Sequence, residues 1–138
     1  MVSITSTQVQ DGEEYQIQTK QPGVYKYLQG KHVIKYEEYP EDEPEGQVQA
    51  TRCILKIAEG TASLVKKGSI ETQMVFQKNH SDRFLYDTPM GSMNMYVHTS
   101  HVELEEQEDL LSLCIRYSLS INHTQTTDCT IQIDVQML

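Results

Sequence analysis

The sequence predicts an all-β protein, folded as a single closed antiparallel up-and-down β-barrel of about eight to ten strands with little helix. Three segments support this prediction, because apolar and polar residues alternate along them almost without error: 92–97, 111–122 and 129–137. A period of two indicates an extended strand with one buried side and one solvent-facing side. Antiparallel strands must also hide their edges, and closure into a barrel does so most economically.

Turn residues recur at short intervals and divide the rest of the chain into further strands, as at Asp11-Gly12 and Pro22-Gly23. The candidate strands run near residues 2–10, 13–21, 24–30, 32–39, 47–58, 61–67, 69–77, 83–88, 92–104, 111–122 and 126–137. We expect one or two of them to be loops or to merge with a neighbour. Segments 51–57 and 105–113 have mixed periodicity, and we assign both to strand and loop rather than to helix.

The last two strands are predicted to form a hairpin across His123-Thr124-Gln125. Its apolar side chains are expected to be buried: Leu113, Ile115, Tyr117, Leu119, Ile131, Ile133 and Val135. Its polar side chains are expected to be exposed: Arg116, Ser118, Gln132 and Asp134. Upstream, Pro89-Met90-Gly91 predicts a bend or bulge, because proline lacks an N–H donor and glycine permits a positive φ.

Composition limits the class of protein. The 138 residues are enough for one domain, residues 1–138, whose core needs no disulfide or metal. Twenty acidic residues against eleven basic ones give a net charge of −9, which disfavours nucleic acid and anionic membranes as partners. Lys66-Lys67 is a pair rather than a cluster, and we find no basic patch along the sequence.

The cysteines and the terminus indicate the compartment. Cys53, Cys114 and Cys129 are odd in number and lack CxxC spacing, as expected for free thiols in a reducing cytoplasm. No apolar run is long enough for a transmembrane helix, and the first residues lack the basic and apolar regions of a signal peptide. We therefore expect a cytoplasmic protein.

Several short motifs occur in an order that resembles a known family. Residues 86–91 have the form Y-x-T-x-x-G, and residues 30–38 combine a Gly-Lys turn, a strand and Tyr-Glu-Glu. Residues 65–68 form a basic turn ending in glycine, and 74–76 form an M-x-F strand. With the closing strands, these features resemble the YwiB-like family of small, uncharacterised, cytoplasmic β-barrel proteins of Gram-positive bacteria.

The resemblance covers nearly the whole chain, roughly Val2 to Val135. One departure is Lys67, where the family usually has arginine before the glycine, which weakens any inference about an anion partner there. The resemblance implies a calycin-like barrel, similar to lipocalins and fatty-acid-binding proteins. It brings no activity and no assigned site, since one fold hosts many functions.

We find no sequence pattern typical of a catalytic or metal-binding site. His98 and His101 would face opposite sides of a strand, and zinc needs three or four convergent ligands. The acidic segments 37–45 and 103–109 lack the spacing and Gly turn of a calcium loop, and we expect solvated loops. No nucleophile motif such as G-x-S-x-G occurs. We therefore predict that the protein is not an enzyme and has no catalytic residue, metal site or cofactor.

The content of tyrosine and methionine suggests one function. The chain has eight tyrosines and six methionines but no tryptophan. Such residues could line a lumen for a small apolar or amphipathic ligand, with hydroxyls to hold its polar end. The candidate lumen residues are Met74, Tyr86, Met93, Met95 and Tyr117. Ordinary cross-strand packing would explain the same residues, and the alternative is then a filled barrel acting as a protein-interaction or structural module.

Overall fold

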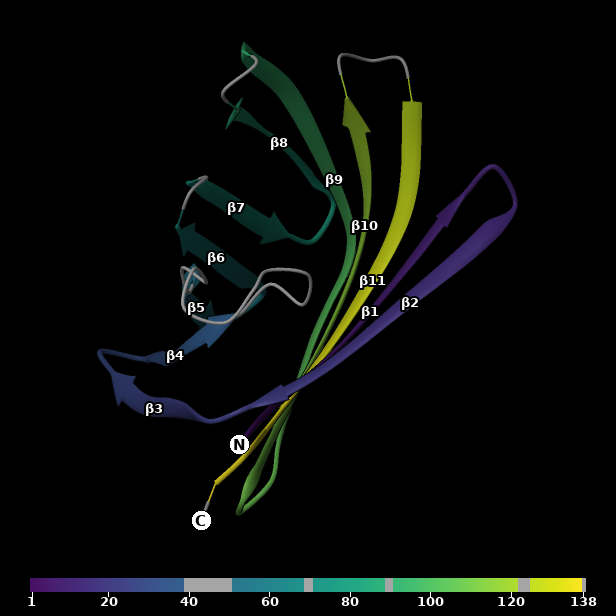
Figure 1. The fold of residues 1–138 in the computed structure, drawn as a ribbon. Coiled ribbons are helices and arrows are strands. Elements are labelled where there is room, and N and C mark those ends of the chain that lie inside the picture. Colours follow the sequence, from purple (N-terminus) through teal and green to yellow (C-terminus); the bar gives the residue numbers. More distant parts are fainter. Residues whose placement is uncertain (39–50, 69–70, 89–90, 122–124, 138) are drawn as a thin grey trace, which may run out of the picture.

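The structure, a computed structural model, describes residues 1–38, 51–68, 71–88, 91–121 and 125–137, with the backbone alone at 86–88 and 125. These residues form antiparallel β-strands and contain no helix (Figure 1). The strands are β1 Val2–Gln10, β2 Glu13–Gln21, β3 Gly23–Leu28, β4 Lys31–Glu38, β5 Thr51–Ala58, β6 Thr61–Lys67, β7 Thr72–Gln77, β8 His80–Thr88, β9 Gly91–Glu106, β10 Leu110–Ile121 and β11 Gln125–Gln136.

The strands divide into two sheets. Sheet A has the order β2-β1-β11-β10-β9-β8, and sheet B has the order β3-β4-β5-β6-β7. Each segment predicted from the alternation coincides with one of these strands, so the expectation that one or two would be loops or merge was wrong. Segment 51–57 is a strand, and the final hairpin pairs β10 with β11 as predicted.

The predicted single closed, calycin-like barrel is wrong, because neither sheet closes on itself. At one seam the chain turns from β2 into β3 at Pro22, and β3 then pairs with β4. At the other seam β7 pairs with β6 and lies beside β8 without a shared ladder in the described residues. Alternation could not reveal this, because strands of a barrel and of two packed sheets both bury one face.

Close packing at the first seam explains the Pro-Gly pair. Proline offers no N–H to a ladder, so it suits the corner between two sheets. A Cβ atom at Gly23 would lie 2.7 Å from Cγ2 of Val2, closer than atoms can approach. Val2 is itself buried, so the corner needs glycine.

At the other seam Asn79 adopts a positive φ of 64°, a conformation that asparagine tolerates well.

The core lies between the inner faces of the two sheets and contains residues of both. In the final hairpin the predicted burial holds for six of the seven apolar residues, and Leu119 is half-buried. Arg116 is exposed as predicted, whereas Ser118, Gln132 and Asp134 are half-buried. Two of these join a polar ladder on the outer face, where Gln132 Nε2 donates to Asp134 Oδ1 over 3.1 Å.

A β-bulge in β9 changes which residues face the core. Tyr117 pairs with Thr99 and Arg116 pairs with His101, so Ser100 is the additional residue. Before the bulge the residues that face the core have odd numbers, and after it they have even numbers, beginning with Val102. The sequence shows the same shift of phase, and the expected strand 92–104 did not account for it. The predicted bend at residues 89–90 lies outside the described residues, although Gly91 does adopt a positive φ of 122°.

No α-helix in the described part of the chain has the length and apolar character needed to cross a bilayer.

Replacing Ile115 with alanine is expected to lower the free energy of unfolding by about 2–4 kcal/mol, because the side chain is buried in the shared core. Replacing the neighbouring Arg116, which points outward, with alanine should lower the free energy of unfolding by less than about 0.5 kcal/mol. Urea denaturation of the two variants measures the difference. Equal costs would contradict the assignment of faces in β10.

Candidate functional site

A cavity of about 530 Å³ lies between the two sheets, beside the seam where β7 and β8 separate. Its walls come from β4 to β7 of sheet B and from β8, β9 and β10 of sheet A. The lining residues are Glu38, Thr51, Lys66, Thr72, Met74, Phe84, Met93, Met95, Tyr117, Leu119 and Ile121. The volume is in the range of small-molecule sites, which are concave and mostly apolar.

Four of the five candidate lumen residues line this cavity: Met74, Met93, Met95 and Tyr117. They come from three strands that are distant in sequence, and the structure brings them together. The fifth, Tyr86, pairs with Met93 in the backbone register, and its side chain lies outside the described residues. The three thioethers are flexible and polarisable, so this wall can adapt to ligands of different shape.

The Tyr117 ring is held firmly in this wall. It packs against Phe76, with ring centroids 4.9 Å apart and planes inclined by 51°. Burial, followed by the neighbouring Cys129, raises the pKa of the Tyr117 hydroxyl above its usual value. The hydroxyl is therefore a neutral hydrogen-bonding group at physiological pH rather than a phenolate.

The polar part of the cavity lining comes from sheet B and holds an ion pair. Lys66 Nζ lies 3.2 Å from each carboxylate oxygen of Glu38, and the two side chains are about one-third exposed. Thr51 and Thr72 add hydroxyl groups to the same lining. Lys66 is on the inner face of sheet B because it pairs with the buried Cys53. The cavity therefore joins an apolar wall to a charged, partly solvated part.

The cysteines near the cavity are poor nucleophiles in this structure. Cys53 and Cys129 are buried, each paired with a tyrosine across the ladder: Tyr36 and Tyr117 respectively. Burial is the main cause that raises the pKa of Cys53 to about 11, and it also raises that of Cys129. Both thiols therefore stay protonated at neutral pH, and the reactive form of cysteine is the thiolate. All three cysteines are free.

A second polar cluster lies outside the cavity and was not predicted. His32 is buried on the inner face of β4, and its Nδ1 lies 2.6 Å from the Tyr25 hydroxyl. Its Nε2 lies 2.7 Å from Oε1 of Glu106. Burial and then the Glu106 charge raise the pKa of Tyr25. Because a carboxylate can only accept, the Nε2–H group donates the hydrogen bond to Glu106, and in that tautomer Nδ1 accepts one from the Tyr25 hydroxyl.

This cluster connects the two sheets, because Glu106 ends β9 of sheet A while Tyr25 and His32 belong to sheet B. Because the pKa of Tyr25 is raised, its phenol stays protonated at neutral pH, and the cluster acts as a hydrogen-bonded link between the sheets. The signal in the sequence was the position of His32, in phase with the buried Ile34 and Tyr36. A polar residue at a core position predicts a hydrogen-bonded cluster.

The prediction that His98 and His101 face opposite sides is wrong. They pair with Ser118 and Arg116, which are two residues apart, so the bulge places both histidines on the outer face. His98 Nδ1 lies 2.8 Å from Ser81 Oγ. His101 Nε2 instead lies 3.0 Å from Glu103, and no group of three or more metal-ligand residues occurs in the described part of the chain.

The acidic segments can be followed only in part. Glu37 and Glu38 belong to β4, and the rest of segment 37–45 lies outside the described residues. In segment 103–109 the acidic residues end β9 and precede β10, and they are exposed.

Comparison with known proteins identifies the family. Residues 2–133 match the model of a family described as a domain of unknown function, DUF1934. The chain belongs to the DUF1934 family. This agrees with the YwiB-like resemblance, because the chain is also similar to the crystal structure of ywiB protein from Bacillus subtilis, with a TM-score of 0.78. The alignment covers 99% of this chain and 90% of that chain, at 18% identity, and so shows the fold alone.

No curated protein matches the chain. Membership of the DUF1934 family therefore brings no activity, and the function must be argued from the cavity and the surface.

Replacing His32 with phenylalanine is expected to lower the free energy of unfolding by about 1–3 kcal/mol, because a ring of similar size loses both hydrogen bonds. The control is Glu105→Gln, because Glu105 is exposed and precedes Glu106 in the sequence. This variant should change the free energy of unfolding little. Denaturation in urea at neutral pH measures both. A His32→Phe variant as stable as the parent would show that the cluster does not hold the sheets together.

Proposed function

We propose that this DUF1934 protein is a non-enzymatic cytoplasmic protein that binds a small amphipathic ligand in the cavity between its sheets. The observation that supports the proposal is the composition of the lining: an apolar wall from both sheets and the Glu38–Lys66 ion pair. This combination of apolar side chains and a partly exposed ion pair matches the two parts of an amphipathic ligand.

The lining indicates how such a ligand would lie. An aliphatic or aromatic portion would pack on Met74, Met93 and Met95, where burial of apolar area provides the driving force. The polar group of the ligand would lie beside the Glu38–Lys66 ion pair and replace one of the two residues as the partner of the other. An anionic group would take the place of Glu38 beside Lys66, whereas an ammonium group would take the place of Lys66.

The ionisation of the described thiol and phenol groups around the cavity favours binding over catalysis. Burial raises the pKa of three thiol and phenol groups in or beside the cavity wall: Cys53, Tyr36 and Tyr117. A catalytic site usually shows the opposite shift at its nucleophile, because the deprotonated form must be available.

A thermal-shift assay with decanoate, decylamine and decanol as probes tests the proposal. At least one probe should raise the melting temperature, and the stabilisation reaches about 2.7 kcal/mol at a ligand concentration one hundred times the Kd. Met93→Trp, which fills the cavity, should remove the shift. The matched control is Leu85→Trp on the outer face of β8, which should keep it.

Two further variants distinguish the polar groups. Lys66→Gln should weaken decanoate, and Glu38→Gln should weaken decylamine, because each removes the charge that the probe needs. If no probe stabilises the parent protein, or if Met93→Trp responds as the parent does, the proposal is wrong.

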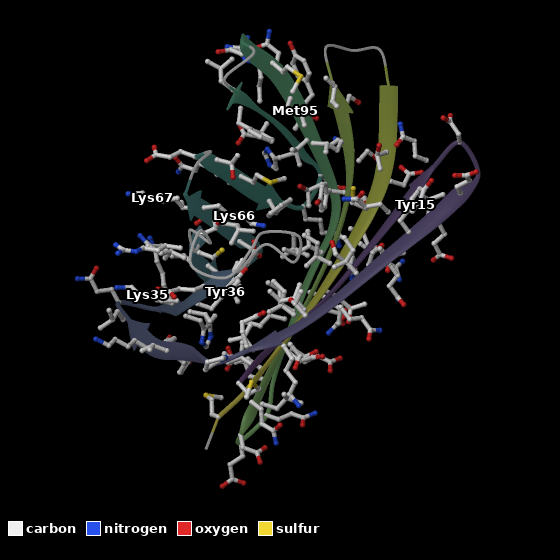
Figure 2. The ribbon with its side chains drawn as sticks, in the orientation of Figure 1. Tyr15, Lys35, Tyr36, Lys66, Lys67 and Met95 are labelled. Atoms are coloured by element: carbon white, nitrogen blue, oxygen red, sulfur yellow. The ribbon has the colours of Figure 1, made fainter. Side chains whose placement is uncertain are left out.

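A second candidate function is self-association, and strand β2 supports it. β2 is an edge strand whose Tyr15 and Ile17 are 56% and 60% exposed. Figure 2 shows Tyr15 on the β1–β2 hairpin, well away from sheet B. In an antiparallel pairing of β2 with a second copy, centred on Ile17, Glu14 of each chain would lie opposite Lys20 of the other.

Charge reversal tests this pairing. Lys20→Glu alone should weaken a dimer about tenfold, because two opposite-charge pairs become repulsive. The double variant Glu14→Lys/Lys20→Glu should restore it. Sedimentation equilibrium measures the association constant of each. A monomeric parent protein at high concentration, or a double variant no better than Lys20→Glu, would exclude this mode of association.

A further inference from the structure

The outer face of sheet B gathers basic residues that are scattered along the sequence. On β4 the buried residues are Ile34 and Tyr36, so Lys35 between them points outward. Residues opposite one another in the ladder share a face, which extends the assignment to β3, β5 and β6. We name the result the basic face, formed by Lys26, Lys31, Lys35, Arg52, Lys56 and Lys67, all exposed. These are six of the eleven basic residues of the chain.

Figure 2 agrees with this placement, because Lys35 and Lys67 project from sheet B on the side away from sheet A. Lys66, next in sequence to Lys67, lies on the inner side with the ion pair. The expectation that the chain has no basic patch therefore fails. Every second residue of a strand points the same way, so lysines far apart in sequence meet on one face without forming a run.

Acidic residues are few on the basic face although the whole chain has a net charge of −9. Among the outward positions of the described strands of sheet B, Glu37 is the one carboxylate, opposite Arg52. Glu59 lies in the turn after β5, and Glu71 precedes β7 at the margin beside Lys67. Most carboxylates of the described residues therefore lie outside the basic face.

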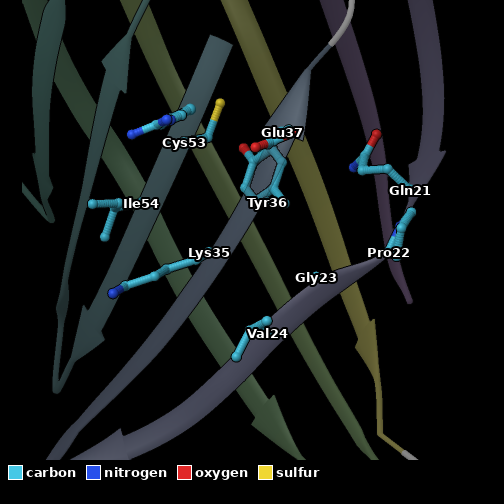
Figure 3. A pocket seen from close by; sticks show the side chains of 10 residues that line it. Gln21, Pro22, Gly23, Val24, Lys35, Tyr36, Glu37, Cys53 and Ile54 are labelled. Carbon is cyan, nitrogen blue, oxygen red and sulfur yellow. The ribbon is translucent and has the colours of Figure 1, made fainter. Parts of the chain in front are cut away.

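Aliphatic side chains lie between the cations. Val24 and Leu28 of β3 are 57% and 56% exposed, and Ile54 and Val65 lie side by side in the ladder. A hollow of about 560 Å³ opens on this face near the corner between β2 and β3 (Figure 3). Its lining comes from the corner and from β3, β4 and β5: Gln21, Pro22, Gly23, Val24, Lys35, Tyr36, Glu37, Arg52, Cys53 and Ile54. No aromatic residue occupies an outward position of the described strands of sheet B.

We propose that the basic face binds an anionic phospholipid surface. Lysine and arginine side chains can reach lipid phosphates with their charged ends, while the aliphatic residues contact the boundary between headgroups and acyl chains. At physiological ionic strength charges more than about 8 Å apart are largely screened. The local face, rather than the net charge, then governs the attraction.

The face suits nucleic acid less well. Binding of single strands relies on aromatic side chains on which bases stack, and the outward positions lack them. Reading a duplex needs a helix or a narrow ribbon that enters a groove, whereas a sheet face is broad. The proposal concerns the outer side of sheet B and is independent of the cavity between the sheets.

Co-sedimentation with phosphatidylglycerol–phosphatidylcholine vesicles tests the proposal, with pure phosphatidylcholine vesicles as the uncharged reference. The parent protein should bind the anionic vesicles and lose binding as salt is raised. The variant K26Q/K35Q/K56Q removes three exposed cations of the basic face and should lower the partition coefficient on the order of a hundredfold. The control K78Q/R116Q removes two exposed cations that lie outside the basic face and outside β2, and it should reduce binding only slightly.

Melting curves of both variants establish that they are folded. Equal loss of binding in the two variants, equal binding to charged and uncharged vesicles, or no binding at low salt would overturn the proposal. Tighter binding to duplex DNA or single-stranded RNA than to the vesicles, at the same salt, would assign the basic face to nucleic acid instead. The Met93→Trp variant changes the cavity but not the basic face, and it should bind the vesicles as the parent protein does. The vesicle experiment therefore tests the basic face independently of the cavity proposal.

Discussion

The structure depends on the burial of the inner faces of its two sheets against each other. Leu113 and Ile133 of sheet A share one apolar cluster with Leu55 and Phe76 of sheet B, and this cluster supplies the main driving force of folding. The chain crosses between the sheets at a corner where Gly23 packs on Val2. At another point the sheets are joined by hydrogen bonds, through the buried His32 and its partner Glu106. Both connections direct the inner faces toward each other.

The same arrangement explains why a cavity exists. Because the ladder is not continuous between β7 and β8, the sheets are free to separate beside this seam, and long side chains fill the space only in part. Methionine suits such a position because it fills irregular space and adapts to what enters it. Charge follows the alternation too: Lys66 faces the cavity and pairs with Glu38, while its neighbour Lys67 faces solvent with the other cations of sheet B. One residue step therefore separates the two proposed binding surfaces.

Strand positions and facing could be predicted from the sequence because they depend on local alternation. Each predicted segment became a strand, and Ile115, Ile131 and Ile133 are buried as expected. Closure could not be predicted in this way, since it depends on how strands tilt and on which edges pair across the seams. The bulge in β9 was visible as a shift from the odd position Val97 to the even position Val102, yet a regular strand was expected there. The error reversed the facing of His101.

The sequence by itself determined the all-β class, the family resemblance and the type of residue that lines the cavity. Its tyrosine and methionine content, together with the strand pattern, pointed to Met74, Met93, Met95 and Tyr117. Only the tertiary structure decided that two open sheets enclose these side chains beside an ion pair. It also brought six distant basic residues to one face of sheet B. Phase along a strand is a local property, whereas the neighbours of a side chain are set by pairing between strands that lie far apart in the chain.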